Sequence, residues 1–229
     1  MQAEGGGRFF AGISERYDLL NRVMSLGLDQ GWRRKLVAAL GQAPSRVLDL
    51  ATGTADVAVA IAKAHPGGAV VGLDPSRGML RQGVPKIPKL PIRLIQGDGQ
   101  RLPFTDDTFD ACCVSFGIRN FPDRTQGLRE MARVVRPGGV VAVLELGEPR
   151  TGPLAPFARL HLKHVVPRLG ALLSGSREYR YLEESVTAFP PPEDFAALMA
   201  NCGLGDVFFE PLTFGAAHLY RGVVPAGAS

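Results

Sequence analysis

The sequence predicts an α/β fold in which helices cover both faces of a doubly wound, mostly parallel sheet. Two observations predict it: short, continuous apolar runs recur along the chain, and helical patterns separate them. Continuous runs, unlike alternating ones, are typical of parallel strands that are buried on both faces. The chain has 229 residues, 45% of them hydrophobic, and no Ser-rich or charge-rich linker divides it. We therefore expect residues 1–229 to form one domain.

Seven segments are candidate strands. The first, second, fourth and fifth are the clearest apolar runs, whereas the third is shorter and is expected nearer an edge of the sheet. The expected strands are 46–50, 69–74, 92–98, 109–116, 139–146, 206–212 and 216–222. A seven-stranded sheet follows.

Helical patterns separate these strands. The expected helices are 54–64, 76–83, 124–136 and 191–203. The third runs into Arg-Pro-Gly-Gly at 136–139, which we interpret as a stop before the next strand. The fourth has Pro at its start and Gly past its end. Two regions lie outside the alternation: residues 8–40 are expected to form an N-terminal helical cap, and residues 153–187 a helical insertion or lid.

The stretch DLATGTADVAVAIAKA, residues 49–64, predicts a strand, a Gly-containing turn and a helix, which is how many nucleotide sites begin. A phosphate-binding P-loop is excluded because no Gly-Lys-Ser/Thr follows Gly53. A dinucleotide site favours three glycines, and here Ala55 and Ala58 replace two of them. NAD(P) binding by an oxidoreductase therefore stays only as an alternative.

Acidic residues near the ends of three expected strands favour S-adenosylmethionine as the cofactor. Ligands of such sheets bind at the carboxyl ends of the strands. Asp49 and the Gly turn would approach the amino-acid end of the cofactor, and Asp74 would accept hydrogen bonds from both ribose hydroxyls. Asp98 would face the adenine amino group. The structural alternative is that these acids only cap helices and turns.

Composition and charge exclude several other classes. The net charge of +4 is compatible with an anionic cofactor or an acidic membrane surface, but no aromatic-basic interleaving supports nucleic-acid binding. The three cysteines lack metal-ligand spacing, and His161 and His164 lack further partners, so we expect no metal site. The start of the chain has no signal-peptide pattern, and no run of about 18 apolar residues occurs. These patterns predict a cytoplasmic protein.

Several motifs follow one another as in class I S-adenosylmethionine-dependent methyltransferases: DLATGTAD, GLDPSRGML, GDGQRLPFTDDTFD, SFGIRNFPD and RVVRPGGVVAVLELGEP. RYDLLNRVMSLGLDQGWRR (16–34) and SFGIRNFPD (115–123) resemble, more narrowly, the ubiquinone/menaquinone biosynthesis C-methyltransferases of the UbiE/MenG type. The resemblance covers about residues 8–222. It implies a Rossmann-like fold with S-adenosyl-L-methionine as methyl donor and S-adenosyl-L-homocysteine as product. The implied reaction is C-methylation of a polyprenyl quinol, most directly demethylmenaquinol to menaquinol.

The resemblance also implies the residues of the cofactor site. They are Asp49, Gly53, Thr54, Asp74, Asp98, Gly99 and Ser115, with Gly53 shaping the turn and Asp49 supporting it. The departures from the family pattern are modest. Gly99 stands where many members have Ala, Gly147 where Ser is common, and Arg136 where Lys is common. They affect the shape of the pocket more than the reaction.

The chemistry requires help with a proton. A quinol carbon becomes strongly nucleophilic as its hydroxyl ionises, and a phenol of pKa about 10 is ionised to only about one part in a thousand near neutrality. Arg119 is the candidate cation for the developing phenolate, with Asn120 as a hydrogen-bonding neighbour. An exposed loop arginine is the structural alternative. Tyr17 and Asp18 could close over the substrate, with a capping or packing role as the alternative, and a water, an acid or a histidine is left as the base.

Some choices stay open in the sequence. A class I methyltransferase of another small-molecule or lipid substrate is one alternative, and a catalytically silent cofactor-binding protein is another. Leucines and valines recur at helical spacing near 159–173, with basic residues between them. This pattern fits either a helix packed on the sheet or a lid at a membrane surface. A peripheral contact with the inner face of the membrane and a homodimer both remain open. Naphthoquinol and benzoquinol substrates share this signature.

Overall fold

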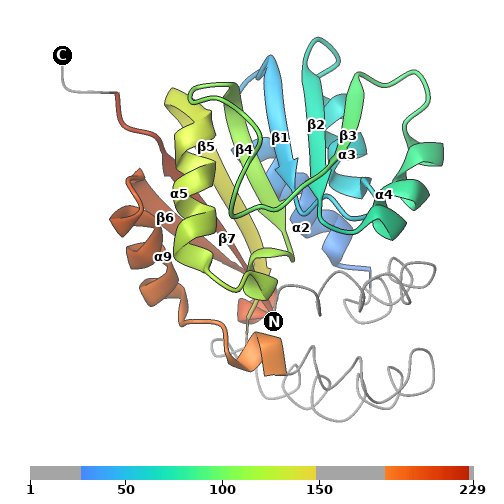
Figure 1. Cartoon of the computed structure of the whole chain (residues 1–229). Coiled ribbons are helices and arrows are strands. Elements are labelled where there is room, and N and C mark those ends of the chain that lie inside the picture. The colour runs from blue at the N-terminus through green and yellow to red at the C-terminus, as the bar shows by residue number, and fades with distance from the viewer. Residues whose placement is uncertain (1–26, 148–183, 227–229) are drawn as a thin grey trace.

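The structure, a computed structural model, describes residues 27–147 and 184–226, which form a seven-stranded sheet of order β3-β2-β1-β4-β5-β7-β6 (Figure 1). The strands are β1 (Arg46–Leu50), β2 (Ala69–Asp74), β3 (Ile92–Gln96), β4 (Phe109–Ser115), β5 (Val135–Leu146), β6 (Gly205–Leu212) and β7 (Ala217–Val223). The first five pair in parallel, whereas β7 is antiparallel to both β5 and β6. The predicted mostly parallel, seven-stranded sheet is confirmed, and β3 lies at an edge as expected.

Helices cover both faces of the sheet. The α-helices with given bounds are α2 (Asp29–Ala39), α3 (Asp56–Ala64), α4 (Arg77–Gly83), α5 (Arg124–Val134) and α9 (Pro192–Asn201). Short 3-10 turns are η1 (Val84–Lys86), η2 (Ile118–Asn120) and η4 (Thr213–Gly215). Helices α5 and α9 lie in front of the sheet in Figure 1, and α2 and α3 lie behind it. The chain is therefore doubly wound, as predicted.

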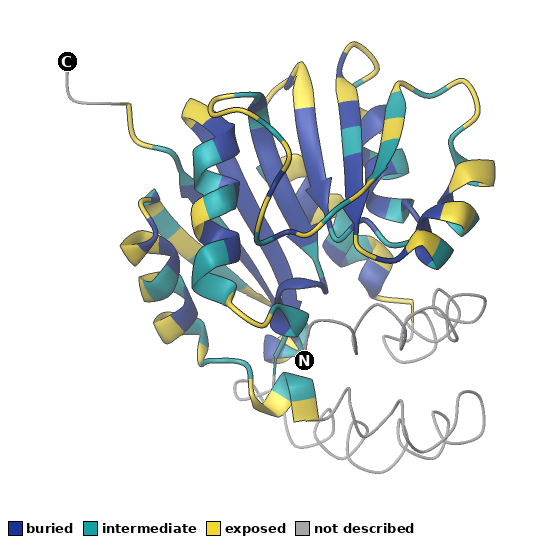
Figure 2. Cartoon of the chain, in the orientation of Figure 1, coloured by how far each residue is buried: buried dark blue, intermediate teal, exposed yellow. Residues whose placement is uncertain are grey.

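The core consists of two apolar layers, one on each side of the central strands (Figure 2). Because successive side chains of a strand point to opposite faces, β1 contributes Val47 to one layer and Leu48 to the other. The first layer also holds Leu36 of α2 and Ile61 of α3. The second holds Leu128 of α5, together with residues of α9. Burial on both faces explains why the central strands read as continuous apolar runs.

Several predicted boundaries were wrong by one to four residues, and three of them have a clear structural cause. The third strand ends at Gln96 and not at residue 98, because the Asp98 carboxylate accepts the Gln100 main-chain N–H and turns the chain away from the sheet. Helix α5 ends at Val134, and the Arg-Pro-Gly-Gly segment lies inside β5 beside a register irregularity. Helix α3 begins at Asp56, since Ala55 before it is left-handed.

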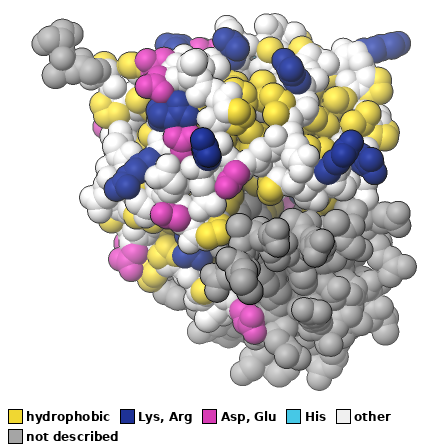
Figure 3. Space-filling view, in the orientation of Figure 1, with side chains coloured by type: hydrophobic (Ala, Val, Ile, Leu, Met, Phe, Trp, Pro, Cys, Tyr) yellow, Lys and Arg dark blue, Asp and Glu magenta, His cyan; other side chains and the backbone are white. Residues whose placement is uncertain are grey.

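A loop takes the place of a helix between β3 and β4. Residues 97–108 cross in front of the sheet from the carboxyl end of β3 to the amino end of β4 (Figure 1). Figure 3 shows apolar side chains at the surface over this part of the sheet, where Val71 and Ile95 are half-buried. The chain thus crosses this face as a loop, and side-chain contacts must hold that loop in place.

Two predicted helical regions lie mostly outside the described residues. Of the N-terminal cap at 8–40, the structure describes 27–40, where α2 forms. Of the insertion at 153–187, it describes 184–187, which are helical. Tyr17, Asp18, His161 and His164 all fall outside.

Candidate cofactor and substrate site

The turn after β1 is shaped by residues with positive φ. Gly53 has φ +56°, and Ala51 and Ala55 on either side have φ 54° and 67°. The left-handed region favours glycine, so this strained turn is held by its surroundings. The Thr52 N–H donates to the Leu73 carbonyl at 3.1 Å, and the Gly53 N–H donates to Asp74 Oδ2 at 2.9 Å. The turn is therefore fastened to the carboxyl end of β2.

Asp49 is buried under this turn. Its Oδ2 accepts the Thr52 hydroxyl at 2.6 Å, and its Oδ1 lies 3.7 Å from Cys113 Sγ. Burial raises the pKa of Asp49 to about 7, although hydrogen bonds from Thr52, Cys113 and the Ala58 N–H of α3 lower it. The carboxyl thus joins the turn, β4 and the first turn of α3, which has no side-chain cap of its own.

Asp74 ends β2 as predicted and is 7% exposed. Its two oxygens accept main-chain N–H groups, Oδ2 from Gly53 and Oδ1 from Ser76 at 2.8 Å. Burial raises the pKa of Asp74, and these two N–H groups lower it in part. A carboxylate oxygen has two lone pairs, so each can accept a second donor such as a ribose hydroxyl.

A charged network lies beside Thr54, which is 4% exposed. Lys86 Nζ donates to Thr54 Oγ1 at 2.9 Å and to Asp56 Oδ1 at 2.7 Å. Arg33 of α2 bonds Asp56 Oδ2 at 3.0 Å. The pKa of Asp56 is lowered by these two cations, although burial opposes the shift. The network connects α2, the start of α3 and η1 around one candidate cofactor residue.

Asp98 and Gly99 begin the loop in front of the sheet. The Gly97 N–H donates to the Asp74 carbonyl at 3.2 Å, so Asp98 lies next to the end of β2. Asp98 is exposed, whereas Gly99 is buried against the ring of Phe121. A Cβ at residue 99 would lie 2.6 Å from Phe121 Cζ, and one at Gly127 would lie 2.5 Å from Phe121 Cδ2. The ring occupies the space that two side chains would otherwise fill.

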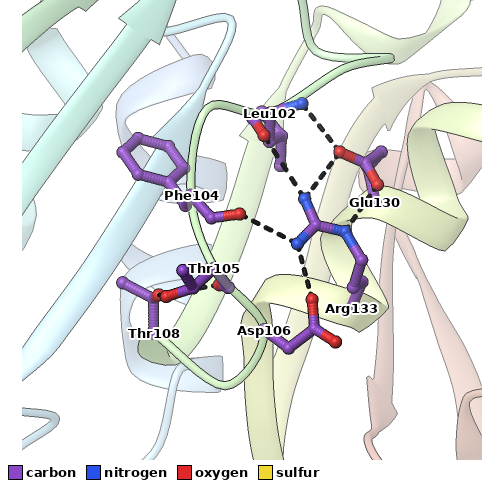
Figure 4. Close-up of polar contacts among 7 residues, drawn as sticks. All are labelled: Leu102, Phe104, Thr105, Asp106, Thr108, Glu130 and Arg133. Carbon is purple, nitrogen blue, oxygen red and sulfur yellow. Dashed lines mark hydrogen bonds and ion pairs between the residues drawn. The ribbon is translucent and has the colours of Figure 1, made fainter.

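Arg133 of α5 holds the rest of this loop (Figure 4). Its guanidinium donates to the carbonyls of Leu102 (3.3 Å) and Phe104 (2.8 Å) and to Asp106 (2.7 Å). It also donates twice to Glu130, whose Oε2 accepts the Leu102 N–H at 2.7 Å. These bonds raise the pKa of Arg133 and lower that of Glu130. The contacts fasten the loop to α5.

Ser115 and Gly117 lie at the carboxyl end of β4. The Ser115 hydroxyl is buried and has no hydrogen-bond partner among the described residues. A Cβ at Gly117 would lie 2.6 Å from Ala51 Cβ, so the segment after β4 runs against the turn after β1. A buried hydroxyl without a partner is costly. The end of β4 therefore fits a polar ligand beside Ser115.

Arg119 is buried, 7% exposed, so the alternative of an exposed loop arginine is wrong. It lies in η2, directly after the end of β4. Its Nη1 donates to Glu145 Oε1 at 2.7 Å and to the Phe116 carbonyl at 2.6 Å. Asn120, the next residue, is half-buried. The ion pair with Glu145 explains why the arginine can be buried here.

The structure thus brings most predicted site residues to the carboxyl ends of four neighbouring strands. Asp49 lies in β1 and Gly53 and Thr54 follow it, Asp74 ends β2, Asp98 follows β3, and Ser115 ends β4 with Arg119 after it. Sequence reasoning missed Glu145, Lys86 and Phe121. The signal for Glu145 was a single charged residue in the apolar run GVVAVLEL. Lys86 and Phe121 gave none, since their roles depend on contacts between distant segments.

The described residues contain no group of three His, Cys, Asp or Glu side chains arranged to hold a metal ion. Nor does the part of the chain that the structure describes include a helix with the length and apolar character needed to cross a bilayer.

Comparison with known proteins identifies relatives over nearly the whole chain. The sequence model of the ubiE/COQ5 methyltransferase family matches residues 3–224. The demethylmenaquinone methyltransferase of Deinococcus radiodurans is 48% identical over 217 residues, 93% of this chain and 90% of that protein. The ubiquinone/menaquinone biosynthesis C-methyltransferase UbiE of Syntrophotalea carbinolica is 45% identical over 218 residues, with 93% and 91% covered.

Solved structures share the fold at low sequence identity. A Haloferax volcanii methyltransferase, solved in complex with the Trm112 activator, superposes with a TM-score of 0.69 at 19% identity, covering 95% of this chain and 98% of that chain. Phosphoethanolamine N-methyltransferase 2 of Haemonchus contortus, in complex with S-adenosyl-L-methionine, gives 0.65 at 14% identity, covering 87% and 53%. These likenesses confirm a Rossmann-like class I methyltransferase fold.

Proposed function

Because the chain belongs to the ubiE/COQ5 methyltransferase family, we propose that it transfers a methyl group from S-adenosylmethionine to a ring carbon of a lipid-tailed quinol, most directly demethylmenaquinol. The observation that carries this proposal is the relationship itself. Identity of 45–48% extends over 93% of the chain to proteins named for demethylmenaquinone or ubiquinone/menaquinone methylation.

The residues at the strand ends fit the methyl donor. The buried Asp74 carboxylate would accept the ribose hydroxyls, and Asp98 with Gly99 would hold the adenine. The Gly53 turn, with Asp49 beneath it and Thr54 beside it, would receive the amino-acid end. The buried Ser115 hydroxyl, which has no hydrogen-bond partner in the described part of the chain, supports the presence of a polar ligand. When bound, this cofactor supplies an electrophilic methyl group on a sulfonium.

The chain's own residues would activate the acceptor. Arg119 lies beyond the end of β4, two residues after Gly117, which runs against the turn after β1, and we assign its cation to the developing phenolate oxygen of the quinol. A cation beside a phenol lowers the phenol's pKa and so raises the fraction of nucleophilic anion. Asn120 would donate a hydrogen bond nearby. Positioning of the reacting carbon behind the methyl group would supply a further share of the barrier reduction, about 7–11 kcal/mol in favourable systems.

Three measurements test the function. The purified protein should methylate demethylmenaquinol with radiolabelled S-adenosylmethionine, and calorimetry should detect binding of S-adenosylhomocysteine. A deletion strain should accumulate demethylmenaquinone, measured by mass spectrometry of its quinones. If the protein binds S-adenosylhomocysteine but methylates neither naphthoquinols nor benzoquinols, its substrate is of another class and the proposed function is wrong.

The assignment of Arg119 has its own test. Arg119→Ala should reduce turnover by about 10²–10³, the range measured for removal of one charge-stabilising donor. Affinity for S-adenosylhomocysteine should stay within a few-fold, because Asp74 and the Gly53 turn are not altered. Unchanged turnover in this variant would remove Arg119 from the reaction. Circular dichroism must first confirm that the variant is folded, since it leaves Glu145 buried without its ion pair.

A peripheral membrane contact and a homodimer are also part of the proposal. A lipid-tailed quinol partitions into the bilayer, so the enzyme must reach a membrane surface to meet it. Co-sedimentation with anionic liposomes at low salt tests the first, and light scattering in solution tests the second.

A further inference from the structure

A fully buried carboxylate, that of Glu145, is hydrogen-bonded to Arg119. Glu145 is near the carboxyl end of β5 and has 0% exposure. Its neighbours along the strand are apolar, so this charge is tolerated only because it is paired and hydrogen-bonded. A strand that needed only to pack would carry an aliphatic residue here. The position therefore calls for a role besides packing.

The two oxygens of Glu145 hold two different parts of Arg119. Oε1 accepts Nη1 of the guanidinium at 2.7 Å, and Oε2 accepts the main-chain N–H at 3.1 Å. Oε1 also accepts the Leu146 N–H at 2.9 Å, which fixes the carboxylate itself. One side chain thus fixes both the backbone and the charged group of the candidate catalytic residue.

Contacts from other elements hold the same segment. Arg124 at the start of α5 donates from Nη2 to the Arg119 carbonyl at 3.2 Å. On β7, His218 is the cross-strand partner of Glu145 and is 7% exposed. Gly147 leaves room for the His218 ring, since a Cβ there would lie 2.6 Å from Nδ1. The surroundings of Glu145 are closed on the β7 side, so its carboxylate is directed at Arg119.

We propose that Glu145 is a positioning residue for methyl transfer, which holds the Arg119 cation in place before the quinol arrives. The inference rests on the proposed function, because that function assigns Arg119 to the quinol oxygen. Glu145 has no exposed surface, so it acts through Arg119 and does not touch the substrate. A charge that is already in place stabilises the transition state without reorganisation at the moment of reaction.

The test replaces Glu145 with an isosteric neutral residue. Glu145→Gln keeps the size and one acceptor oxygen, but it removes the charge and sets an NH2 group against the Arg119 donors. We expect kcat with demethylmenaquinol to fall by at least about tenfold, the lower end of effects measured for partners that orient a functional side chain. The dissociation constant of S-adenosylhomocysteine should stay within about threefold of the wild-type value, because the hydrogen bonds of Glu145 hold Arg119 and the Leu146 N–H and not the cofactor residues. This kcat loss without a change in cofactor affinity is not expected from a purely structural role.

Asp110→Asn is the matched control. The Asp110 carboxylate also accepts main-chain N–H groups, from Ser45 and Arg46, and an arginine, Arg136. It lies near the amino end of β4, away from the site. This variant should leave kcat within about twofold of wild type. An equal loss of kcat in both variants would mean that loss of stability, and not loss of positioning, causes the effect of Glu145→Gln. That result would overturn the inference.

A double-mutant cycle identifies the route of the effect. Arg119→Met and Arg119→Met/Glu145→Gln should have the same kcat, because Glu145 has nothing to position once the cation is gone. The double variant also removes both buried charges, so it folds even where the single Glu145 variant does not. If Glu145→Gln is unfolded by circular dichroism, Glu145→Asp replaces it, since the shorter side chain cannot hold both Arg119 donors. A further, multiplicative loss in the double variant would contradict the inference.

A readout without turnover separates this inference from the proposed function. Hydrogen exchange at the Arg119 amide, measured by mass spectrometry on peptides spanning residues 116–121, should be protected in wild type and faster in Glu145→Gln, but unchanged in Asp110→Asn. Failure of wild type to methylate demethylmenaquinol would overturn the proposed function, while the exchange result would still show whether Glu145 fixes the Arg119 segment. Unchanged exchange together with unchanged kcat in Glu145→Gln would overturn the inference alone.

Discussion

At the scale of single residues, the ring of Phe121 fits because two glycines face it. A Cβ at Gly99 would meet the ring at 2.6 Å, and one at Gly127 would meet it at 2.5 Å. The departure from alanine at residue 99, noted in the sequence, is therefore a packing requirement of Phe121. It bears on function because Gly99 follows Asp98 in the candidate adenine site.

Gly99→Ala should destabilise the protein by about 1–3 kcal/mol, the usual cost of overpacking, because the ring has no room to move toward Gly127. Adding Phe121→Val should recover much of this loss, since the smaller side chain makes room for the new methyl group. Urea unfolding of the two single variants and the double variant gives the coupling between the sites. Strictly additive effects would show that the ring and residue 99 do not compete for space.

The buried Asp49 carboxyl predicts a pH dependence of stability. Its pKa is raised to about 7 in the folded chain, whereas an unfolded chain has an Asp pKa of about 3.9. Between these values the folded state binds one more proton than the unfolded state, so the free energy of unfolding decreases as the pH rises, by about 1.4 kcal/mol per pH unit. Above about pH 7 both states are ionised and the decrease stops. The groups facing Asp49 are Thr52, Cys113, the Ala58 N–H and, at longer range, Arg33.

Asp49→Asn should remove this dependence. From pH 5 to pH 7 the wild-type protein should lose about 2–3 kcal/mol of unfolding free energy relative to the variant. From pH 7 to pH 8 the difference between the two proteins should stay constant. Urea titrations at each pH measure it. Parallel pH profiles for the two proteins would mean that Asp49 is already ionised at pH 5.

At the scale of elements, the loop 97–108 is held by hydrogen bonds from side chains, whereas a helix in its place would be held by its own main-chain hydrogen bonds. Arg133 satisfies two of its carbonyls and one of its carboxylates, and Glu130 satisfies the Leu102 N–H (Figure 4). The loop begins at the candidate adenine residues. Its order should therefore affect cofactor binding.

Arg133→Lys should weaken binding of S-adenosylhomocysteine by a few-fold to about tenfold. A lysine has one donor atom where the guanidinium has a planar fork, so it cannot reach all of these acceptors together. The loss of one net hydrogen bond, about 0.5–1.5 kcal/mol, sets this range. Arg136→Lys is the matched control, because Arg136 is more exposed than Arg133 and pairs with Asp110 near the amino end of β4, whereas the candidate site lies at the carboxyl end. Equal affinities for all three proteins would mean that the loop does not order the site.

The elements also show which features a sequence can predict. Apolar runs located strands β1 and β2 to the residue, because most of their positions are buried. The Arg-Pro-Gly-Gly segment was assigned to a break, but it lies within β5, since Gly138 at φ +77° allows the chain to bulge and continue. The three acids were found from their places near the carboxyl ends of strands. Glu145 was not, because its importance comes from Arg119, which is 26 residues away in the sequence.

At the scale of the whole molecule, helix α2, near the start of the described residues, makes hydrogen bonds to η4 and β7, near their end. Trp32 Nε1 donates to Thr213 Oγ1 at 2.9 Å, and Arg221 Nε donates to the Ala39 carbonyl at 3.2 Å. The Trp32 ring also meets Phe116 edge-on, at a centroid distance of 6.2 Å. Phe116 begins the segment that leads to Arg119. Helix α2, the C-terminal strands and the candidate catalytic segment therefore share one set of contacts.

This connection predicts a single cooperative unfolding transition. Trp32 is the chain's one tryptophan, so its fluorescence reports the docking of α2, while far-UV circular dichroism reports the whole sheet and its helices. The two signals should give the same urea midpoint, because α2 cannot leave without breaking contacts to β5 and β7. S-adenosylhomocysteine at 100 times its dissociation constant should raise the unfolding free energy from both signals equally, by about 2.7 kcal/mol. A fluorescence midpoint at lower urea would show that α2 detaches before the sheet unfolds, and that the cofactor site does not depend on it.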